Sequence, residues 1–508
     1  MFALLIDTVS IQKFIFGSNK LRDNLGASFL VQAIFESNFI KDLKNIPLKE
    51  NDNSCKGYIG GGNALFFFDE YEIAKNFVEE WSEKLLIEAP GLNSAVAISE
   101  FLITDNDDPS FQPKLKELFK ILNNNKAEFI ANTIIPKHGI TADCERSGYS
   151  KDVWIKFPQK EDATGYYSSQ VNAKFAFAGK ALEKLETDYK DIIGSEFKFT
   201  NDLEKLGKSH GEDSHLSIVH IDGNSMGKKF QACKTLNELK TLSAKVENAT
   251  RDSFKVLLKT IINEWDFIKK EIQPETESGK YIIPIRPIIM GGDDITFVCD
   301  GRLGIYFAKI FMEAFEKHTD SEGNKLTSCA GISITKLKFP FYRGYQIAEQ
   351  LCTNAKVIRN DKDDKGSWID FHISSGNISG SLEEIRNRYY KNGKNTLLKR
   401  PYKICDDSTI SGFDLFVENT ASLFSEKDGK QTFPQSKIKE LRTVLTLGES
   451  ARKSFQVQLE ASGNKLPKVE KYSGYNTDFF SDENTIYFDM IELGDVYPKF
   501  ELKRRSGK

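Results

Sequence analysis

The strongest constraint on the fold is an internal repeat of strand, helix, glycine-turn hairpin, helix and strand. In the first copy, residues 2–7 form an apolar run that ends on Asp7, and residues 20–40 have helical spacing. Two apolar runs then flank a glycine turn over Tyr58–Phe68, which is typical of a β-hairpin. The copy ends with a predicted helix and a predicted strand, at about 70–87 and 94–99.

The same order returns in the second half of the chain. Leu216–Asp222 is again an apolar run that ends on an acid, and helical spacing covers roughly 233–272. The rest of the copy is a second hairpin, a helix and a strand, at 281–299, about 301–318 and 328–334. Two βαββαβ units, each with its helices on one face of a sheet, satisfy this pattern. We therefore expect an α+β fold with two ferredoxin-like domains.

The length of 508 residues accommodates three or four domains. We expect the first repeat, a small inserted region with a helix over about 170–192, the second repeat and a C-terminal helical domain, at 1–124, 125–210, 211–380 and 381–508. Residues 207–213 are polar and predict a linker. Helical patterning is clear over 436–461, and the basic tail over 499–508 is predicted to be solvated.

Composition excludes several function classes. The net charge is −3, whereas a protein that grips nucleic acid alone is usually basic, so any RNA would come with partners. The seven cysteines contain no C-x-x-C pair, which indicates reduced thiols and argues against a four-cysteine zinc site. Histidines 210, 215 and 220 lack the usual metal-ligand spacing, and no adjacent His-Asp pair occurs. With neither a secretory leader nor a membrane-spanning run, we expect a cytoplasmic protein without membrane contact.

The turn of the second hairpin carries the most informative residues, Gly291, Gly292, Asp293 and Asp294. Glycine tolerance of positive φ explains the first two, but a tight turn does not need two adjacent carboxylates. In a sheet of the expected order they converge with Asp222. Carboxylates held together repel one another, and their pKa values rise unless a cation neutralises them. Such hard oxygen ligands suit Mg²⁺ or Mn²⁺.

This arrangement predicts two-metal nucleotidyl transfer, in which one ion activates a hydroxyl and the other, roughly 3.5–4 Å away, holds the triphosphate. The backbone carbonyl of Ile221 would complete one metal shell. Lys356 follows the third strand on a helix, where it would neutralise phosphate; a solvated helix face is the alternative. Backbone amides at a helix start can also hold phosphate, here those of Gly223, Asn224, Ser225, Met226 and Gly227. The alternative for the whole motif is a surface turn plus a helix cap.

The first repeat keeps Asp7 but lacks the acidic pair. Its turn reads Gly60, Gly61, Gly62 and Asn63. Metal catalysis is therefore not expected there. Because a glycine turn lets a ligand approach the backbone closely, we expect this copy to bind a second nucleotide across a pseudo-twofold axis.

At these motifs the sequence resembles a known family, the large subunit of type III CRISPR effector complexes (CRISPR-associated protein ten). The Asp222-Gly-Asn-x-Met-Gly227 segment and the Gly-Gly-Asp-Asp turn look like that family's second palm domain. The segment from Ile11 to Ser28 looks like the first palm of its Cmr branch. The likeness covers most of residues 1–380.

The resemblance implies an enzyme that converts ATP to cyclic oligoadenylate when the ribonucleoprotein captures target RNA. Some Cmr relatives instead join S-adenosylmethionine to AMP, so S-adenosylmethionine is a possible second substrate. The implied partners are the other type III subunits, guide RNA and target RNA. Carried over to this chain, Asp222, Asp293 and Asp294 bind the metal ions, and Lys356 contacts phosphate.

Two departures from the family qualify these expectations. The first palm strand begins at residue 2, so we expect no HD nuclease domain and no DNA cutting by one. The family's cysteine cluster between the palms is reduced to Cys144, which puts zinc in doubt. Two other functions stay open, a non-catalytic scaffold in the ribonucleoprotein and a free-standing cyclic-dinucleotide cyclase.

Overall fold

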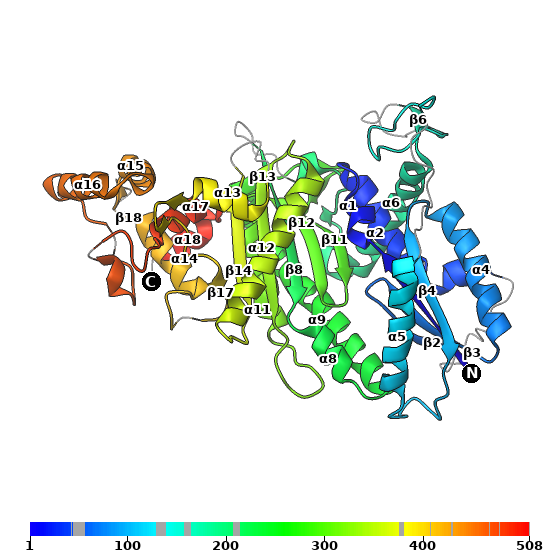
Figure 1. Cartoon of the computed structure of the whole chain (residues 1–508). Coiled ribbons are helices and arrows are strands. Elements are labelled where there is room, and N and C mark those ends of the chain that lie inside the picture. The colour runs from blue at the N-terminus through cyan, green and yellow to red at the C-terminus, as the bar shows by residue number, and fades with distance from the viewer. Residues whose placement is uncertain are drawn as a thin grey trace.

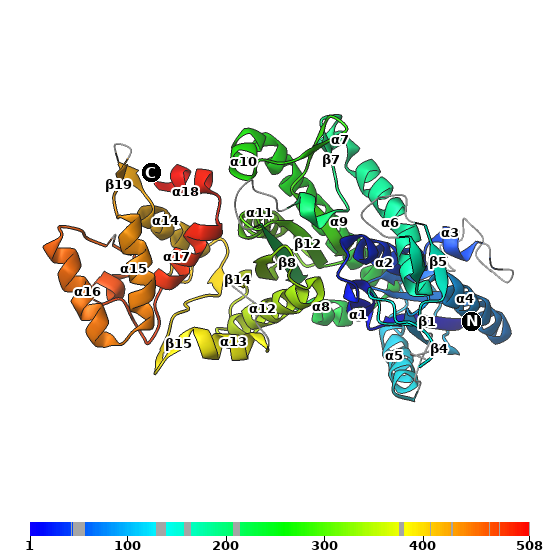
Figure 2. The same cartoon turned by 90° about the horizontal axis from the view of Figure 1, so that it is seen from above.

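The computed structural model describes residues 1–41, 43, 56–128, 139–156, 164–206, 214–374, 380–406, 408–427, 430–466, 468–476 and 478–506. The predicted linker at 207–213 lies outside these ranges. Three masses follow one another, with the first repeat at one end, the second repeat in the middle and the C-terminal domain at the other end (Figures 1 and 2). Among the described residues, no helix combines the length and the apolar character that crossing a bilayer requires.

The first repeat contains the antiparallel four-stranded sheet that the sequence predicts. Its order is β2-β3-β1-β4, with bounds β1 (Phe2–Val9), β2 (Lys56–Gly60), β3 (Asn63–Phe68) and β4 (Asn93–Glu100). Its helices are α1 (Ile11–Phe16), α2 (Leu21–Ala33), α3 (Ser37–Ile40), α4 (Tyr71–Glu88) and α5 (Phe111–Glu128). This is the ferredoxin-like topology.

The second repeat has the same core and two additional strands. Its order is β11-β12-β8-β13-β14-β17, with bounds β8 (His215–Gly223), β11 (Ile285–Gly291), β12 (Asp294–Asp300), β13 (Ser328–Lys336), β14 (Trp368–Ile373) and β17 (Tyr402–Lys403). Its helices are α8 (Met226–Ala232), α9 (Leu236–Asn263), α10 (Trp265–Ile272), α11 (Gly304–Phe315) and α12 (Phe341–Asp361). The prediction of two ferredoxin-like domains is confirmed.

In each repeat the two helices inside the βαββαβ unit share one face of the sheet, as expected, and an additional helix after the last strand of the unit covers the other face. In the first sheet, Leu4 and Ile6 pack in the cluster that contains α2 and α4. The alternate residues Ala3 and Leu5 belong to a second cluster, which contains Leu118 of α5. Strands that are apolar on both sides have to be buried on both sides. The unbroken apolar run over residues 2–6 is the sequence counterpart of this arrangement.

One predicted strand is divided in two. The run over 281–290 was expected to be a single strand of the hairpin, but β11 begins only at Ile285. Pro284 lacks the N–H that a continuous central ladder needs. The residues before it form β10 (Lys280–Ile282), which pairs with β7 (Phe197–Lys198) and β9 (Thr276–Glu277).

The region between the repeats packs against both of them. Its main helix, α6 (Ser169–Asp188), lies so close to α2 that a Cβ on Gly26 would overlap the Lys174 carbonyl. The remaining elements are β5 (Val153–Ile155), β6 (Gly165–Tyr167), α7 (Lys190–Ile193) and a 3₁₀ turn (Leu203–Lys205). Helix α5 runs past the predicted boundary at residue 124. The inserted region is therefore part of the packed body.

The C-terminal domain is helical, as predicted, with small hairpins between its helices. Its elements are α13 (Leu382–Tyr389), β15 (Lys391–Asn392), β16 (Asn395–Thr396), α14 (Phe413–Leu423), β18 (Glu426–Lys427), β19 (Lys430–Gln431), α15 (Gln435–Thr446), α16 (Glu449–Ala461), a 3₁₀ turn (Ser473–Asn476), α17 (Tyr487–Val496) and α18 (Lys499–Ser506). The basic tail is not simply solvated. Helix α18 buries Leu502, and Arg505 forms an ion pair with Asp414 at 2.8 Å.

Candidate functional site

The second hairpin places two of the predicted acids side by side. Asp294 starts β12 directly opposite Asp222 on β8, and Cys329 of β13 lies on the other side of Asp222. Gly291 pairs with Asp294, which leaves Gly292 and Asp293 as a two-residue turn. Gly292 has a φ of 58°, so the turn needs a residue that tolerates the left-handed region there.

Asp293 reaches the same place because Gly223 leaves room for it. The Gly223 N–H donates to the Asp293 carbonyl at 3.2 Å. A Cβ on Gly223 would lie 2.7 Å from Asp293 Cβ and 2.8 Å from its Oδ2. The absence of a side chain at the end of β8 thus lets the Asp293 carboxylate lie over that strand end, next to Asp222.

The three acids are coupled electrostatically. Burial raises the pKa of Asp293 to about 7, and the charges of Asp222 and Asp294 add to the effect. Asp294 Oδ1 is buried and faces His220 Nδ1 at 3.3 Å. A raised carboxylate pKa and three adjoining carboxylates both fit a divalent cation. No three carboxylate, histidine or cysteine side chains in the described ranges are already gathered as a metal cage, so the acids would have to turn toward the ion.

Lys356 of α12 forms an ion pair with Asp222. Burial is the largest single influence and lowers the pKa of this lysine, but the interactions with Asp222 and with neighbouring groups together outweigh burial, and the pKa is raised. The ammonium group therefore stays charged beside the acids. Neutralisation of phosphate by Lys356 stays a prediction; in this structure the ammonium group is paired with Asp222.

His220 is a site residue that sequence reasoning missed. It lies on β8 two residues before Asp222, with Nδ1 at 3.3 Å from Asp294 Oδ1 and 3.0 Å from Thr296 Oγ1. Burial is the largest single influence and lowers the pKa of His220, but the interactions with Asp294, Asp222 and Glu349 together outweigh burial, and the pKa is raised. The only sequence signal was its position on the same side of the strand as Asp222.

The segment after Asp222 is only partly placed for ligand binding. Asn224 is buried, and its Nδ2 donates to Thr327 Oγ1 at 3.1 Å, so its side chain holds the loop. Met226 is also buried, in the core. Ser225 is exposed with a φ of 60°, and Gly227 lines the cavity described next. Ile221 lies inside the central strand between Ile295 and Ala330, and its carbonyl as a metal ligand stays a prediction.

A cavity of about 1380 Å³ separates the two repeats. The turns of both hairpins line it, with Gly60, Gly61, Gly62 and Asn63 from the first repeat and Gly291, Gly292, Asp293 and Asp294 from the second. Asp222 and Lys356 are not among the described residues of this lining. The structure therefore brings the two predicted turns to one space, although they are distant in the sequence.

The first repeat contains a counterpart of the acid–lysine pair. Asp7 lies opposite Asn63, as Asp222 lies opposite Asp294. Asp7 forms an ion pair with Lys126, from the helix that follows the last strand of its repeat. The oxygen of the Asn63 side chain is buried and has no hydrogen-bond partner in the described part of the chain.

Comparisons with known proteins relate the second repeat to a known domain and the whole chain to a known fold. Residues 215–365 match a family model described as Cas10/Cmr2, second palm domain. No curated protein sequence matches the chain. Among solved structures, Csm1 from T. onnurineus has 14% identity and a TM-score of 0.53, and the match covers 97% of this chain and 69% of the other.

Two further structures show the same likeness. A Csm1–Csm4 cassette in complex with cA3 has 13% identity and a TM-score of 0.52, and one with AMPPNP has 12% and 0.51; both matches cover 97% of this chain and 69% of the other. At this level of identity the likeness concerns the fold. Residues 215–365 thus match the second palm domain of Cas10/Cmr2, and the chain as a whole shares the fold of Csm1.

Proposed function

We propose that this chain is the large subunit of a type III CRISPR effector complex of the Cmr branch. In that complex it makes an adenylate second messenger from ATP, with Mg²⁺ or Mn²⁺, when target RNA is bound. The product would be cyclic oligoadenylate or an S-adenosylmethionine–AMP conjugate. The second-palm match over 215–365 and the fold shared with nucleotide-bound Csm1–Csm4 cassettes support this assignment.

One observation carries the proposal. The acidic turn of the second repeat and the glycine turn of the first line the same cavity of about 1380 Å³. Small-molecule sites usually occupy roughly 300–1,000 Å³, so this space has room for two nucleotides. One nucleotide would lie at the acids as donor, and the other at Gly60–Asn63 as acceptor.

The three acids of the second repeat would bind the metal ions. Asp222, Asp293 and Asp294 would hold the divalent cations, with the Ile221 carbonyl as a further ligand. A bound cation would supply Lewis-acid activation of a hydroxyl and stabilisation of the leaving pyrophosphate. His220 keeps Asp294 oriented, since it lies against that carboxylate from within the sheet.

Lys356 exchanges partners in this scheme. With the acids unneutralised it pairs with Asp222. Once a cation satisfies Asp222, the ammonium group is free to turn to a phosphate oxygen. The glycines at 291 and 292 let the triphosphate approach the turn without a side chain in the way.

The assembled complex tests the proposal directly. We expect labelled ATP, Mn²⁺ and target RNA to give a product larger than AMP that Asp293→Ala/Asp294→Ala abolishes. The Asp105→Ala/Asp107→Ala variant is a matched control, because these two acids lie in the loop after β4, away from the cavity lining. Mass spectrometry with and without S-adenosylmethionine identifies the product.

The alternatives predict different outcomes. A scaffold subunit would give only background hydrolysis and no Mn²⁺ or ATP binding by calorimetry. A free-standing cyclase would be fully active as the isolated chain without RNA. Either result would contradict the proposal.

A further inference from the structure

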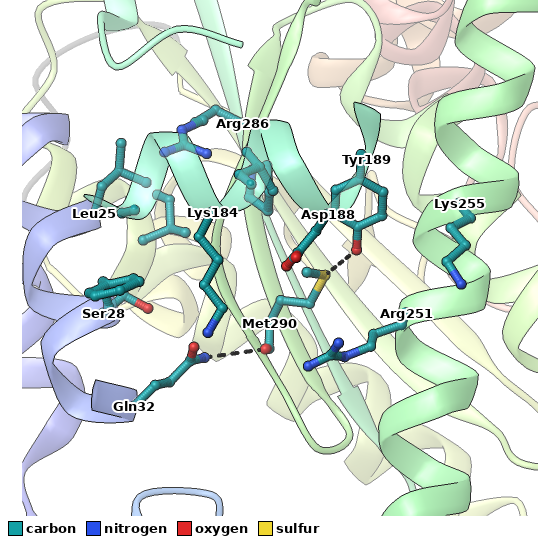
Figure 3. A pocket seen from close by; sticks show the side chains of 15 residues that line it. Leu25, Ser28, Gln32, Lys184, Asp188, Tyr189, Arg251, Lys255, Arg286 and Met290 are labelled. Carbon is teal, nitrogen blue, oxygen red and sulfur yellow. Dashed lines mark hydrogen bonds between the residues drawn. The ribbon is translucent and has the colours of Figure 1, made fainter. Parts of the chain in front are cut away.

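A second, smaller cavity adjoins the first one, and Ser28 and Gln32 line both. Its volume is about 250 Å³, and it is bounded by α2, α6, α9 and the strand β11 (Figure 3). Strand β11 contributes Arg286, Pro287, Ile288 and Met290, and then runs directly into Gly291 of the catalytic turn.

The lining is strongly cationic. It holds Lys184, Arg251, Lys255 and Arg286 against one carboxylate, Asp188. Three of the cations are exposed and form surface ion pairs, Lys184–Glu36 at 3.0 Å, Arg251–Glu247 at 2.8 Å and Lys255–Asp252 at 2.8 Å. Exposed pairs of this kind contribute little to stability, so these side chains can be redirected to an anion at little cost.

Arg286 is the unusual member of the set, because its side chain is 1% exposed. Its Nη2 donates to Asn201 Oδ1 at 3.0 Å, and its buried Nε has no hydrogen-bond partner among the described residues. Burial lowers the pKa of Arg286 to about 9, and only the charge of Glu186 opposes this. The guanidinium is therefore still charged at neutral pH. A buried cation without a paired anion is costly, and an anion in the cavity would offset that cost.

The cavity is also connected to the catalytic turn. Gln32 Nε2 donates to the Met290 carbonyl at 3.3 Å, and the Tyr189 hydroxyl contacts Met290 Sδ at 3.5 Å (Figure 3). The register of β11 against β12 shifts between Pro287 and Ile289, which is a bulge along the cavity wall. Bulges redirect the side chains of the strand that follows, here the strand that ends in Gly291.

We propose that this cavity binds a compact phosphate-bearing anion, with Arg286 at its buried end and Arg251, Lys255 and Lys184 around its mouth. Multiple cations around a small space suit a multiply charged phosphate better than a single carboxylate. A volume of about 250 Å³ accommodates phosphate, pyrophosphate or a nucleoside monophosphate. Because β11 carries both Arg286 and the start of the catalytic turn, occupancy of this site would alter how firmly that turn is held.

The test measures binding with the catalytic acids removed, so that its failure is separate from failure of the proposed function. The full chain carrying Asp293→Ala/Asp294→Ala is titrated calorimetrically with inorganic phosphate, pyrophosphate and AMP in the presence of EDTA. We expect at least one of the three anions to bind. The anion that binds most tightly shows whether the natural ligand is free phosphate, pyrophosphate or a nucleotide. Adding Arg251→Ala/Lys255→Ala should weaken binding about tenfold or more, since two charge-assisted contacts are lost.

Two control variants locate the binding. Lys259→Ala removes an exposed lysine from the same helix that does not line the cavity, and it should leave the affinity unchanged within about twofold. Lys356→Ala removes the cation at the catalytic acids and should also leave it unchanged. Dissociation constants above about 1 mM for all three anions would overturn the proposal. Binding that survives Arg251→Ala/Lys255→Ala but is lost with Lys356→Ala would overturn it as well.

A thermal readout tests Arg286 itself. Arg286→Met replaces a buried unpaired charge by an apolar side chain of similar length, so the ligand-free variant should be at least as stable as the parent. Pyrophosphate should raise the melting temperature of the parent but not of Arg286→Met. Equal stabilisation of both proteins would contradict the role of Arg286. If Arg286→Met does not fold, the calorimetric comparison with Arg251→Ala/Lys255→Ala still tests whether the cavity binds an anion.

Discussion

The two repeats use the same hairpin in opposite ways. In the first, Thr8 carries a side chain at the end of the central strand, and Gly62 opposite it has none; the Thr8 hydroxyl donates to the Gly62 carbonyl at 2.6 Å. In the second, Gly223 replaces the threonine, and Asp293 replaces the glycine of the turn. Only one member of each pair has room for a side chain. A carboxylate on the turn thus requires a glycine on the strand.

The backbone of the two turns differs accordingly. Gly61 and Gly62 have φ values of 60° and 80°, the signs of a type I′ turn. In the turn of the second repeat only Gly292 has a positive φ, of 58°, which matches the signs of a type II′ turn. The second turn therefore accepts a residue with a side chain at its second position. The comparison teaches that the acidic site depends on a turn type and a glycine as well as on acids.

The largest expected effect comes from neutralising one central-strand acid in each repeat. Asp222→Asn should reduce product formation by at least about 100-fold, because it removes charge next to Asp293 and Asp294. Asp7→Asn should reduce it far less, since an asparagine already faces Asp7. Turnover of labelled ATP by the assembled complex measures both. Equal losses would show that the first repeat is catalytic as well.

Next in size is the steric exchange between strand and turn. Gly223→Ala should destabilise the fold by about 1–3 kcal/mol, since the new Cβ overlaps Asp293. Gly62→Asp should cost a similar amount, because a side chain there meets Thr8 and Ile11 at a φ of 80°. Urea unfolding measures both. Gly179→Ala, in open space on α6, serves as the control and should be neutral or slightly stabilising.

A smaller difference in turnover should distinguish Lys356 of the second repeat from Lys126 of the first. Lys356→Ala should lower turnover about tenfold, because a phosphate contact and the partner of Asp222 are lost together. Lys126→Ala should leave turnover within about twofold, since its partner Asp7 faces an asparagine and not an acidic pair. Steady-state kinetics with varied ATP measures the difference. A tenfold loss from Lys126→Ala would instead assign the first-repeat lysine to the acceptor nucleotide.

The smallest effect concerns pH. Without metal, native Asp293 keeps its proton up to a pKa of about 7, whereas the unfolded carboxyl loses it near its ordinary value of 3.8. This group's contribution to stability therefore falls as pH rises between these values. Asp293→Asn should raise the free energy of unfolding at pH 8, and change it by nothing measurable at pH 3. Urea unfolding in EDTA checks this, and an equal gain at both pH values would contradict it.

The sequence predicts the features that depend on residues adjacent in the chain. The apolar runs, the glycine turns and the order of the repeat are local, so both sheets and the acidic turn follow from them. The reciprocity of Gly223 and Asp293 could not be predicted, because it depends on how β8 lies against the hairpin. His220 and Arg286 were missed for the same reason. Each looks like an ordinary strand residue until the neighbouring strands and helices are placed around it.

Strand β17 has a consequence for how the molecule can be divided. It adds residues from beyond 380 to the sheet of the second repeat by pairing with β14. Arg386 and Arg400 fasten the same strand from the C-terminal side, through Asp370 at 2.7 Å and the Phe371 carbonyl at 2.8 Å. A chain cut at Gly380 would expose a sheet edge and leave Asp370 buried without its cation. The sheet of the second repeat and the C-terminal domain are thus expected to behave as one unit in expression, proteolytic resistance and cooperative unfolding.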